Sequence, residues 1–417
     1  MKQKESRKGG TMTKEKSTVP RLRFPGFTTT WKQRKLGEEI SFYNGRAYKQ
    51  SELLDVGKYK VVRVGNFNTN EKWYYSNLEL EDSKTIDTGD LIYLWATSFG
   101  PEIWKGAKSI YHYHIWKLII KQVEKIDKNY LYTWLYQDKE KIAQNTNGST
   151  MVHITKKMIE NRDFEFPTLP EQEAIGSFFS DLDQLITLHQ RKLDDVKELK
   201  KALLQKMFPK GNGNDFPELR FPEFTDAWKQ RKLGEVGYAK SGVGFPEKEQ
   251  GGTTGIPFFK VSDMNTNGNE NELVVANNYV TDEQISKRKW RVITEVPAIF
   301  FAKVGAAVML NRKRLIRHPF LLDNNTMTYV FNHTQWDTNF GKTLFETIDL
   351  IQLTQVGALP SYNSSDVENI NISLPTLPEQ EAIGSFFSDL DQLITLHQRQ
   401  LDHLKLLKKA LLQQMFI

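Results

Sequence analysis

The stretch PTLPEQEAIGSFFSDLDQLITLHQR occupies residues 167–191, and the same letters return without a change at residues 375–399. We call these two copies the tail motifs. The first copy continues as KLDDVKELKKALLQKMF to residue 208, and the second continues as QLDHLKLLKKALLQQMF to residue 416. Unrelated segments do not converge on such likeness, so the chain contains a duplication and has two matched halves.

A second repeated unit lies upstream of each tail motif. LRFPGF at residues 22–27 leads to WKQRKLGE at 31–38, and LRFPEF at 219–224 leads to WKQRKLGE at 228–235. We call these the head motifs. Each half therefore consists of a head, a middle that differs between the halves, and a tail. If the repeat closes on itself, the C-terminus should return close to the first head motif.

Each tail motif predicts a long helix, over residues 170–208 in the first half and 378–416 in the second. Thr168 and Glu171 have the spacing of a capping box, and Pro170 falls in the first turn, where its missing N–H costs nothing. A helix of about 55 Å with a wide apolar face needs a partner, and its twin supplies one. Apolar residues with near-heptad spacing include Ile175, Phe178, Leu182, Leu185, Val196, Leu199 and Leu203.

One polar residue occupies the centre of this apolar stripe. Heptads counted from Ile175 reach His189, and the counterpart in the second copy is His397. In an antiparallel pair the helix midpoints meet, so the two imidazoles would form a polar layer that sets the register. Alternatively, each histidine extends to the edge of the stripe and reaches solvent.

The two middles, residues 39–157 and 236–365, contain short runs of Val, Ile, Phe, Tyr and Trp punctuated by Asn and Gly. These runs predict strands and tight turns, with helices near residues 128–144 and 336–354. We therefore predict an α+β fold with two globular domains, separated by two long helices that form an antiparallel coiled coil, in a pseudo-twofold internal repeat.

Composition narrows the class of protein. The chain has 417 residues, no cysteine and a net charge of +6. The absence of cysteine excludes disulfides and thiolate zinc sites and fits a reducing cytoplasm, and no apolar segment predicts a secretory signal or a membrane span. The basic excess suits a polyanionic partner. Residues 1–18 are polar and Lys-rich, which predicts a disordered basic tail.

No catalytic motif is apparent. Gly341-Lys-Thr343 resembles the end of a phosphate loop, but Trp336 stands where the first glycine is required. No metal-ligand spacing of histidines occurs, and the cluster Tyr111–His114 is explained by alternate residues of a strand. No site for a metal or for catalysis is expected. The two halves are built to bind.

The head and tail motifs, duplicated around dissimilar middles, resemble those of the specificity (S) subunit of Type I restriction–modification enzymes. The resemblance covers essentially the whole chain after the basic tail. It implies a non-catalytic subunit whose middles are two target-recognition domains, each reading one half of a bipartite, asymmetric site in double-stranded DNA. The helical rod would set the spacing and dock two methyltransferase (M) subunits.

The same resemblance implies that the chain itself binds no cofactor. AdoMet, ATP and Mg²⁺ are expected on partner subunits, with the restriction (R) subunits joined through the M subunits. The division that follows is a tail over 1–18, a first recognition domain over 19–157 and a central conserved region over 158–210. The second recognition domain covers 211–365, with a linker over 211–216 and its head motif over 219–235, and a distal conserved region covers 366–417.

Candidate DNA contacts come from polar loops of the middles, because Arg and Lys suit phosphates and guanine edges and Asn suits adenine. In the first middle they are Arg46, Lys49, Ser98, Asn147 and Ser149. In the second middle they are Lys240, Ser241, Lys303, Arg312, Lys313, Arg314, Arg317, Asn324, Ser361 and Asn363. Apolar residues beside the helical seam that could contact M subunits are Phe179, Ile186, Phe387 and Ile394.

The geometry of DNA agrees with this interpretation. Two readers held on a rod of this length can contact one face of B-DNA a helical turn apart, roughly 34 Å. Two alternatives belong to other classes of protein. One is a coiled-coil scaffold whose domains bind protein or glycan, and the other is a single-chain DNA-modifying enzyme, which the missing motifs disfavour.

Overall fold

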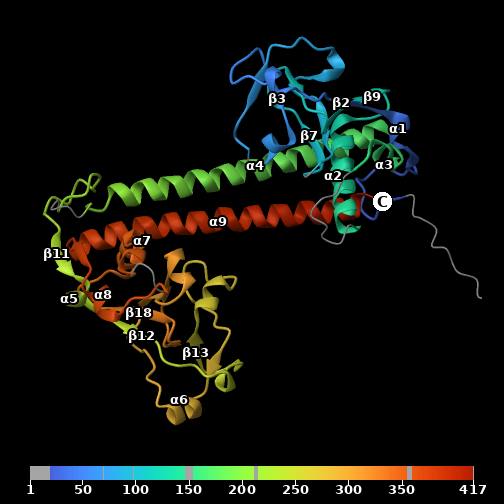
Figure 1. Ribbon diagram of the computed structural model, residues 1–417. Helices are drawn as coiled ribbons and strands as arrows, with labels where there is room; N and C mark the ends of the chain where they lie inside the picture. Colours follow the sequence, from blue (N-terminus) through green and yellow to red (C-terminus); the bar gives the residue numbers. More distant parts are fainter. Residues whose placement is uncertain are drawn as a thin grey trace, which may run out of the picture. The chain divides into compact units, whose positions relative to one another are not determined.

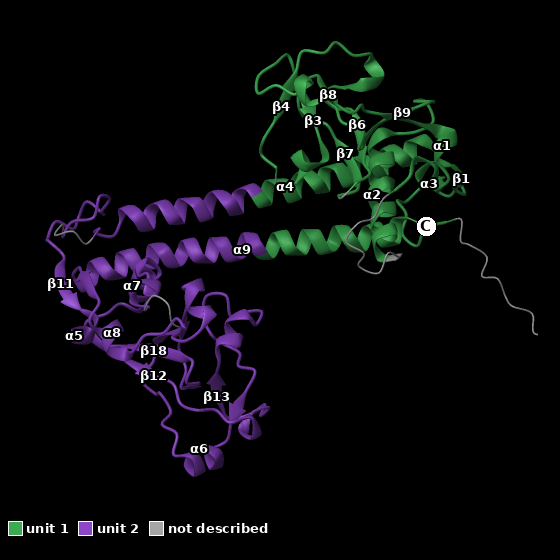
Figure 2. Ribbon diagram, in the orientation of Figure 1, with its two compact units in different colours: residues 1–190, 399–417 green, residues 191–398 purple. Residues whose placement is uncertain are grey.

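The computed structural model describes residues 19–68, 70–96, 98–145, 154–210, 215–354 and 359–416. The chain divides into two compact units, which Figure 2 colours separately. Unit 1 comprises Met1–Gln190 and Arg399–Ile417, and unit 2 comprises Arg191–Gln398. Each unit therefore contains one head motif, one middle and parts of both long helices.

Unit 1 is built around a four-stranded antiparallel sheet in the order β2-β9-β6-β7. The run LIYL of β6 is buried throughout, as expected for an inner strand covered on both faces. The strands are β2 (Ile40–Asn44), β9 (Ile115–Ile120), β6 (Leu91–Leu94) and β7 (Gly100–Ile103). A second sheet in the order β4-β3-β8-β5 comprises β4 (Tyr74–Ser76), β3 (Tyr59–Val62), β8 (Ser109–Tyr111) and β5 (Thr85–Ile86).

Unit 2 repeats this plan. Its main antiparallel sheet has the order β12-β18-β15-β16, and a three-stranded sheet has the order β14-β13-β17. The main strands are β12 (Gly237–Ser241), β18 (Thr326–Phe331), β15 (Ala298–Ala302) and β16 (Lys313–Ile316). The smaller sheet comprises β14 (Tyr279–Val280), β13 (Ile256–Phe259) and β17 (Leu321–Leu322). In both units the second sheet contains one parallel pair, β3 with β8 and β13 with β17.

Helices complete the two domains. Unit 1 contains α1 (Leu36–Glu39), α2 (Lys128–Asn145) and α3 (Lys156–Glu160), and unit 2 contains α5 (Leu233–Val236), α6 (Asp282–Arg288), α7 (Thr338–Thr347) and α8 (Ser364–Glu368). The 3-10 helices are η1 (Gln50–Glu52), η2 (Val64–Phe67), η3 (Asp82–Lys84), η4 (Glu247–Glu249), η5 (Val261–Asn265), η6 (Ala306–Leu310) and η7 (Leu350–Leu353). The helix expected at 336–354 is therefore shorter, because the chain is extended at Ile348 and resumes as η7.

The long helices are α4 (Leu169–Lys206) and α9 (Leu377–Met415), drawn in Figure 1. In unit 1, Phe179 of α4 lies 6.1 Å from the ring of Phe416, which follows α9, and four residues later Asp183 pairs with Lys408 at 2.6 Å. Progress along one helix thus means return along the other. The helix segments of unit 1 are antiparallel.

Unit 2 contains the same antiparallel arrangement. Lys200 of α4 pairs with Asp391 of α9 at 2.7 Å, and Phe208, just after α4, lies 6.1 Å from the ring of Phe387. The predicted fold class is confirmed: two α+β domains of one plan, carried by two long antiparallel helices. The structure thereby explains why the apolar stripe of each tail motif is so wide, since it packs on both a helix and a domain.

Head and tail motifs meet in a repeated frame. Each pairs through a two-stranded ladder, β1 (Lys32–Lys35) with β10 (Asp163–Phe166) and β11 (Lys229–Lys232) with β19 (Asn371–Leu374). The Leu22 N–H donates to the Gln414 carbonyl at 2.9 Å, as the Leu219 N–H does to Lys206. The C-terminal end of α9 therefore returns to the first head motif, as expected.

The glutamate expected to close a capping box has a different partner. Arg23 binds the Glu171 carboxylate through Nε at 2.5 Å and Nη2 at 2.7 Å, and Glu171 is fully buried. Arg220 binds Glu379 in the same way, at 2.7 Å and 2.7 Å. The glutamate of each tail motif thus holds the arginine of the head motif.

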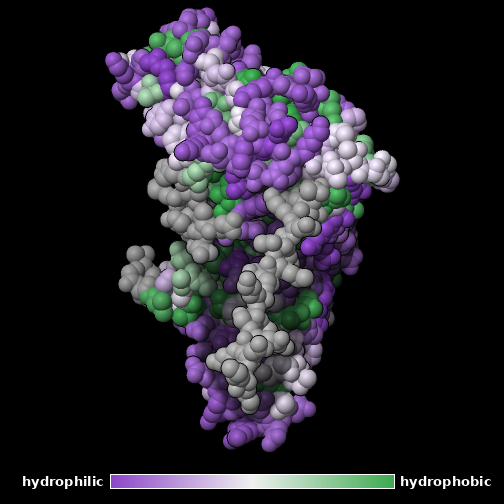
Figure 3. All heavy atoms as spheres, turned by 90° about the vertical axis from the view of Figure 1, so that its right-hand side faces the viewer, coloured by the Kyte–Doolittle hydropathy of each residue, from purple (hydrophilic) through white to green (hydrophobic). Residues whose placement is uncertain are grey.

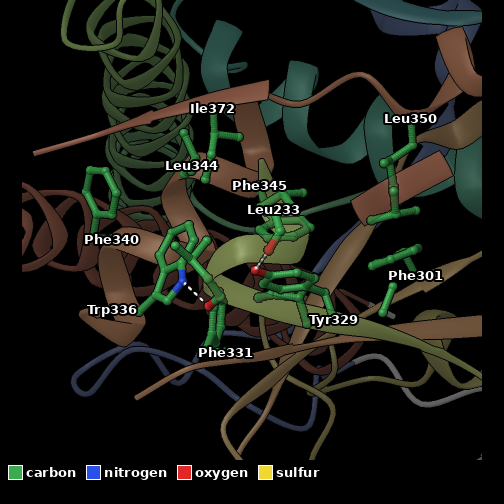
Figure 4. Packing of buried hydrophobic residues seen from close by; sticks show 14 of the residues in the cluster. Leu233, Phe301, Tyr329, Phe331, Trp336, Phe340, Leu344, Phe345, Leu350 and Ile372 are labelled. Atoms are coloured by element: carbon green, nitrogen blue, oxygen red, sulfur yellow. Dashed lines mark hydrogen bonds between the residues drawn. The ribbon is translucent and has the colours of Figure 1, made fainter. Parts of the chain in front are cut away.

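Each domain has an aromatic core that fixes the frame to the sheet. Figure 4 shows part of the core of unit 2, where the Tyr329 hydroxyl donates to the Leu233 carbonyl at 2.8 Å and the Trp336 indole N–H donates to the Val236 carbonyl at 2.8 Å. Both polar atoms are buried with their bonds satisfied, which removes the cost of desolvation. The cores thus place α5 and β12 relative to the tail motif.

Candidate nucleic-acid interface

The frame and the variable loops lie at opposite ends of each main sheet. In unit 1, β2 starts at Ile40, directly after the head motif, and ends at Asn44. Because its neighbours are antiparallel, the loops after Asn44 and Leu94 and before Ile115 share the far end. In unit 2 the corresponding loops follow Ser241 and Ala302 and precede Thr326. We call this the loop end of each domain.

Backbone bonds tie the loops of unit 1 together at the loop end. The Tyr113 N–H donates to the Arg46 carbonyl at 3.1 Å, and the Trp95 N–H donates to the His114 carbonyl at 3.2 Å. Gly45 permits this approach, because a Cβ there would lie 2.2 Å from the Tyr111 carbonyl oxygen. The Ile154 N–H, just before α3, donates to the Trp95 carbonyl at 3.4 Å.

An aromatic cluster covers this surface. His112, Tyr113 and His114 lie between β8 and β9, so their interpretation as alternate residues of a strand is wrong. The ring of His114 lies 4.0 Å from that of Tyr113 and 4.9 Å from that of Trp95. The Tyr48 ring stacks on His112 at 6.4 Å and 27°. Tyr113 is 39% exposed, so the cluster presents an aromatic face at the surface.

The Arg46 guanidinium at this end is already paired with a carboxylate. Arg46 pairs with Glu52 at 2.8 Å and lies 5.3 Å above the Tyr48 ring. The pKa of Glu52 is lowered, mainly by a hydrogen bond from the Lys49 N–H and also by Arg46. Burial, with smaller contributions from His114 and Arg63, lowers the pKa of His112 to about 4. His112 is therefore neutral at pH 7 and offers one donor and one acceptor.

Unit 2 forms its loop end with matching backbone bonds. The Lys303 N–H donates to the Asn325 carbonyl at 2.9 Å, and the Tyr362 N–H donates to the Lys303 carbonyl at 3.4 Å. Gly242 is again required, because a Cβ there would lie 1.8 Å from the Asp323 oxygen. Lys303 thus stands where unit 1 has Trp95, and residues 323–325 stand where unit 1 has residues 112–114.

Several residues predicted from the sequence lie at the loop ends of the two domains. Lys49 is exposed, and the Ser98 hydroxyl donates to Asn68 at 3.0 Å. In unit 2, Asn324, Ser361 and Asn363 are exposed, and the bridge between Val304 and Ser361 links their loops. Lys240 and Ser241 end β12, and the Ser241 hydroxyl lies 3.4 Å from that of Ser364. Asn147 and Ser149 lie outside the described residues.

The basic cluster at 312–317 is bound within its own domain. Lys313 donates to the Ile348 carbonyl at 2.5 Å and to Asn311 at 2.8 Å, and burial lowers its pKa to about 8. Arg314 donates to the Asn269 carbonyl at 2.7 Å. Arg312 donates to Asn265 at 2.8 Å, and Arg317 donates to Glu272 at 3.1 Å and Asn339 at 3.2 Å. These cations hold η5, β16 and α7 together.

Two of the residues predicted to contact partners are not at the surface. Phe179 and Phe387 are 1% and 0% exposed and belong to the domain cores, because each packs against the phenylalanine that follows the other long helix. Ile186 and Ile394 are half-buried, and Ile186 lines a groove between α2, α4 and α9 in unit 1.

The long helices also expose apolar residues that the sequence does not predict to be at the surface. Leucines are exposed at the same positions of both tail motifs, although the heptad pattern assigned two of them to the seam. A single stripe of each helix contains them, by helical spacing. They are Leu185, Leu188 and Leu199 on α4, with Leu393, Leu396 and Leu407 on α9.

His189 and His397 are each half-buried on their own helix. His189 belongs to unit 1 and His397 to unit 2, so their pairing stays a prediction. Within the described ranges, no three His, Cys, Asp or Glu side chains are arranged to hold a metal ion. In the same part of the chain, none of the helices has the length and apolarity needed to cross a membrane.

Figure 3 shows one face of the molecule by hydropathy. It is mainly hydrophilic, and hydrophobic residues are scattered between polar ones.

Two domains related by duplication, with one frame and divergent loop ends, define a two-part recognition protein. The model of the Type I restriction modification DNA specificity domain matches the chain twice, at residues 28–198 and 225–406. The chain belongs to this family of DNA specificity proteins, and it is a recognition subunit rather than an enzyme.

One known relative matches most of the chain, and another matches less than half of it. The specificity subunit of the Type I restriction enzyme MjaVIII from Methanocaldococcus jannaschii is 24% identical over 415 residues, covering 89% of this chain and 96% of the relative. That of EcoBI from Escherichia coli is 21% identical over 182 residues, covering 42% of this chain and 37% of the relative. The crystal structure of an S subunit from M. genitalium matches 96% of this chain and 99% of its own, with a TM-score of 0.64 and 14% identity, which concerns the fold alone.

Proposed function

We propose that this chain selects a bipartite, asymmetric site in double-stranded DNA, and that the loop end of each domain reads one half. One observation carries the proposal. The same backbone bonds form both loop ends, through Trp95 in unit 1 and Lys303 in unit 2, yet the side chains there differ. A shared frame with unlike reading surfaces is what two different half-sites require.

The exposed leucines support docking of two methyltransferase subunits. Each tail motif exposes leucines at the same two positions. They are Leu185 and Leu188 on α4, and Leu393 and Leu396 on α9. Exposed apolar stripes on helices favour contact with partner helices. Because the stripe occurs twice, two copies of one partner can bind in equivalent ways. R subunits would join through the M subunits.

The chemistry of the complex would then reside on the partners. We propose that AdoMet, ATP and Mg²⁺ bind to the M and R subunits and that this chain binds none of them. We also propose that the complex acts in the cytoplasm, where the host DNA is. Between the domains, His189 and His397 would form the polar layer that sets the register of the two long helices.

The test of this function is a methylation map. The chain is co-expressed with its cognate methyltransferase subunit in a host that lacks other adenine methylation, and N6-methyladenine is mapped across the genome. We expect one split motif with unlike halves. A stable complex that leaves no split motif would contradict the proposal and favour a protein or glycan scaffold.

A second measurement tests the contact with DNA directly. The affinity of the purified complex for a duplex is measured between 50 and 200 mM salt. Phosphate contacts release counterions, so binding should weaken steeply, by about 10³-fold or more for six or more contacts. Binding that is insensitive to salt would exclude phosphate contacts as the source of affinity.

A further inference from the structure

We propose that the two domains read bases with different chemistry from one structurally equivalent turn: an aromatic surface of Tyr113 and Trp95 in the first domain, and an amide and ammonium surface of Asn324 and Lys303 in the second. This inference rests on the proposed function and names the residues that determine specificity. The aromatic surface would contact thymine methyl groups, and the second surface would contact adenine and guanine edges.

The equivalence of the two turns follows from the backbone. In unit 1 the turn lies between β8 and β9, and the His112 N–H donates to the Val62 carbonyl at 2.9 Å. In unit 2 it lies between β17 and β18, and the Asp323 N–H donates to the Phe259 carbonyl at 3.0 Å. Each turn also forms a parallel bridge to the residue after the required glycine, Arg46 in unit 1 and Val243 in unit 2.

The aromatic turn suits apolar contact. The Trp95 indole N–H is occupied, because it donates to the Tyr113 carbonyl at 2.8 Å, so the indole presents only its ring. The Trp95 ring also stacks on Trp116 at 5.8 Å and 20°, which holds it in place. A fixed ring loses little entropy on binding. Apolar and aromatic side chains in the major groove select thymine through its methyl group.

The His112 imidazole does not turn this surface into a phosphate clamp. His112 lies 4.9 Å from His114 and close to Arg63, and both neighbours oppose a further positive charge. The Arg46 guanidinium is bound to Glu52 through Nη2, at 2.8 Å and 3.0 Å. Arg46 and His112 therefore offer little free cationic charge to phosphates, and the aromatic faces of Tyr113 and Trp95 form the contact surface.

The second turn suits polar contact. Asn324 is exposed at its tip, and an amide can both donate to and accept from adenine. Asp323 would repel DNA if it were exposed, but it is 5% exposed and accepts bonds from the Asn325 N–H at 3.3 Å and the Asn325 amide at 3.4 Å. The acid thus shapes the turn from inside. Lys303, beside the turn, supplies a donor for guanine.

The experiment uses methylation maps of the full complex with Tyr113→Ala and Asn324→Ala, each measured beside the wild type. Both side chains are exposed, so the fold should survive. We expect each variant to relax base preference at one or two positions in one half of the motif only, with the two variants affecting opposite halves. Discrimination at those positions should fall by about tenfold to a hundredfold.

Matched controls separate reading from folding. Val123 and His333 are exposed and follow the ends of β9 and β18 that lie away from the loop end. Val123→Ala and His333→Ala should therefore leave the motif unchanged. Tyr113→Phe retains the ring and should restore the wild-type motif. The inference is overturned if Tyr113→Ala leaves every position unchanged, relaxes the same half as Asn324→Ala, or abolishes methylation without relaxing any position. Failure of the proposed function is distinct, because the wild type would then yield no split motif.

Discussion

Arg23 and Glu171 are 148 residues apart in the chain, yet the guanidinium binds both oxygens of a fully buried carboxylate, at 2.5 Å and 2.7 Å. Arg220 and Glu379 repeat the arrangement, and there the Trp228 indole N–H also donates to Glu379 at 3.1 Å. The head and tail motifs are therefore partners in one contact. A change in one motif would leave a buried charge unpaired in the other.

Glu171→Gln should destabilise unit 1 by about 3–5 kcal/mol, because it leaves the Arg23 guanidinium, which is 11% exposed, without its counter-charge. Hydrogen exchange resolved along the chain measures the loss, and protection of unit 2 should be retained. The double variant Arg23→Met with Glu171→Met should recover much of the stability. Glu79→Gln breaks an exposed pair with Lys58 and is the control, with no measurable effect.

Gly176→Ala should destabilise unit 1 although alanine is the better helix former by about 1 kcal/mol. A Cβ at Gly176 would lie 2.5 Å from Asp127 Oδ1 and 2.6 Å from the Tyr130 nitrogen, where α2 begins. We expect a net loss of about 1–3 kcal/mol in the free energy of unfolding, measured by denaturant titration. Gly384→Ala meets Asp337 and Phe340 in the same way and should show the same sign. An increase in stability in both variants would contradict the packing of α2 and α7 on the long helices.

Unit 1 should lose stability on mild acidification because of His112. Its pKa falls from 6.5 to about 4 on folding, so between these values the unfolded chain binds a proton that the folded chain does not. Stability therefore decreases as the pH falls from about 6.5 to about 4. The charged and titratable groups that face His112 are His114, Arg63, Tyr113 and Tyr48. His112→Gln should flatten the pH dependence of protection in unit 1, and an unchanged slope would mean that folding does not lower the pKa of His112.

Leu188→Asp and Leu396→Asp should each weaken binding of one methyltransferase subunit, because each places a charge on one copy of the exposed stripe. Native mass spectrometry of the mixed subunits should show complexes with one partner in the single variants and none in the double variant. Val56→Asp, at a residue that is 84% exposed in the first domain, should leave two partners bound. Retention of both partners in the double variant would exclude the leucine stripe as the docking surface.

The fold was largely predictable because duplication and helical periodicity are local signals. The contact of Arg23 with Glu171 was not, since the spacing of Thr168 and Glu171 satisfies a capping box equally well. Phe179 was assigned to an outer face because the sequence does not reveal that Phe416 packs against it. An apolar stripe shows which face is buried, but not what covers it.

The candidate interface was predictable only in part. The sequence predicts Lys303 as a contact because it lies beside Gly305 in a loop, and Asn324 because asparagine suits adenine, and the structure brings their loops together. Lys313 was also selected for its charge, but its ammonium is bound to the Ile348 carbonyl at 2.5 Å. The aromatic turn at residues 112–114 was missed, because its residue types are also common in strands. Composition identifies a charge, and only the fold determines whether that charge is already paired.

We infer that one frame carries two interchangeable recognition domains. The most direct test replaces residues 39–157 with residues 236–365. The junctions are equivalent, because the Leu36 N–H donates to the Arg162 carbonyl at 2.9 Å and the Leu233 N–H donates to the Ile370 carbonyl at 3.0 Å. N6-methyladenine is then mapped with the same methyltransferase. We expect a motif made of two inverted copies of the second half-site, with the first half-site lost. A chimera that assembles with its partners but retains the wild-type motif would contradict it.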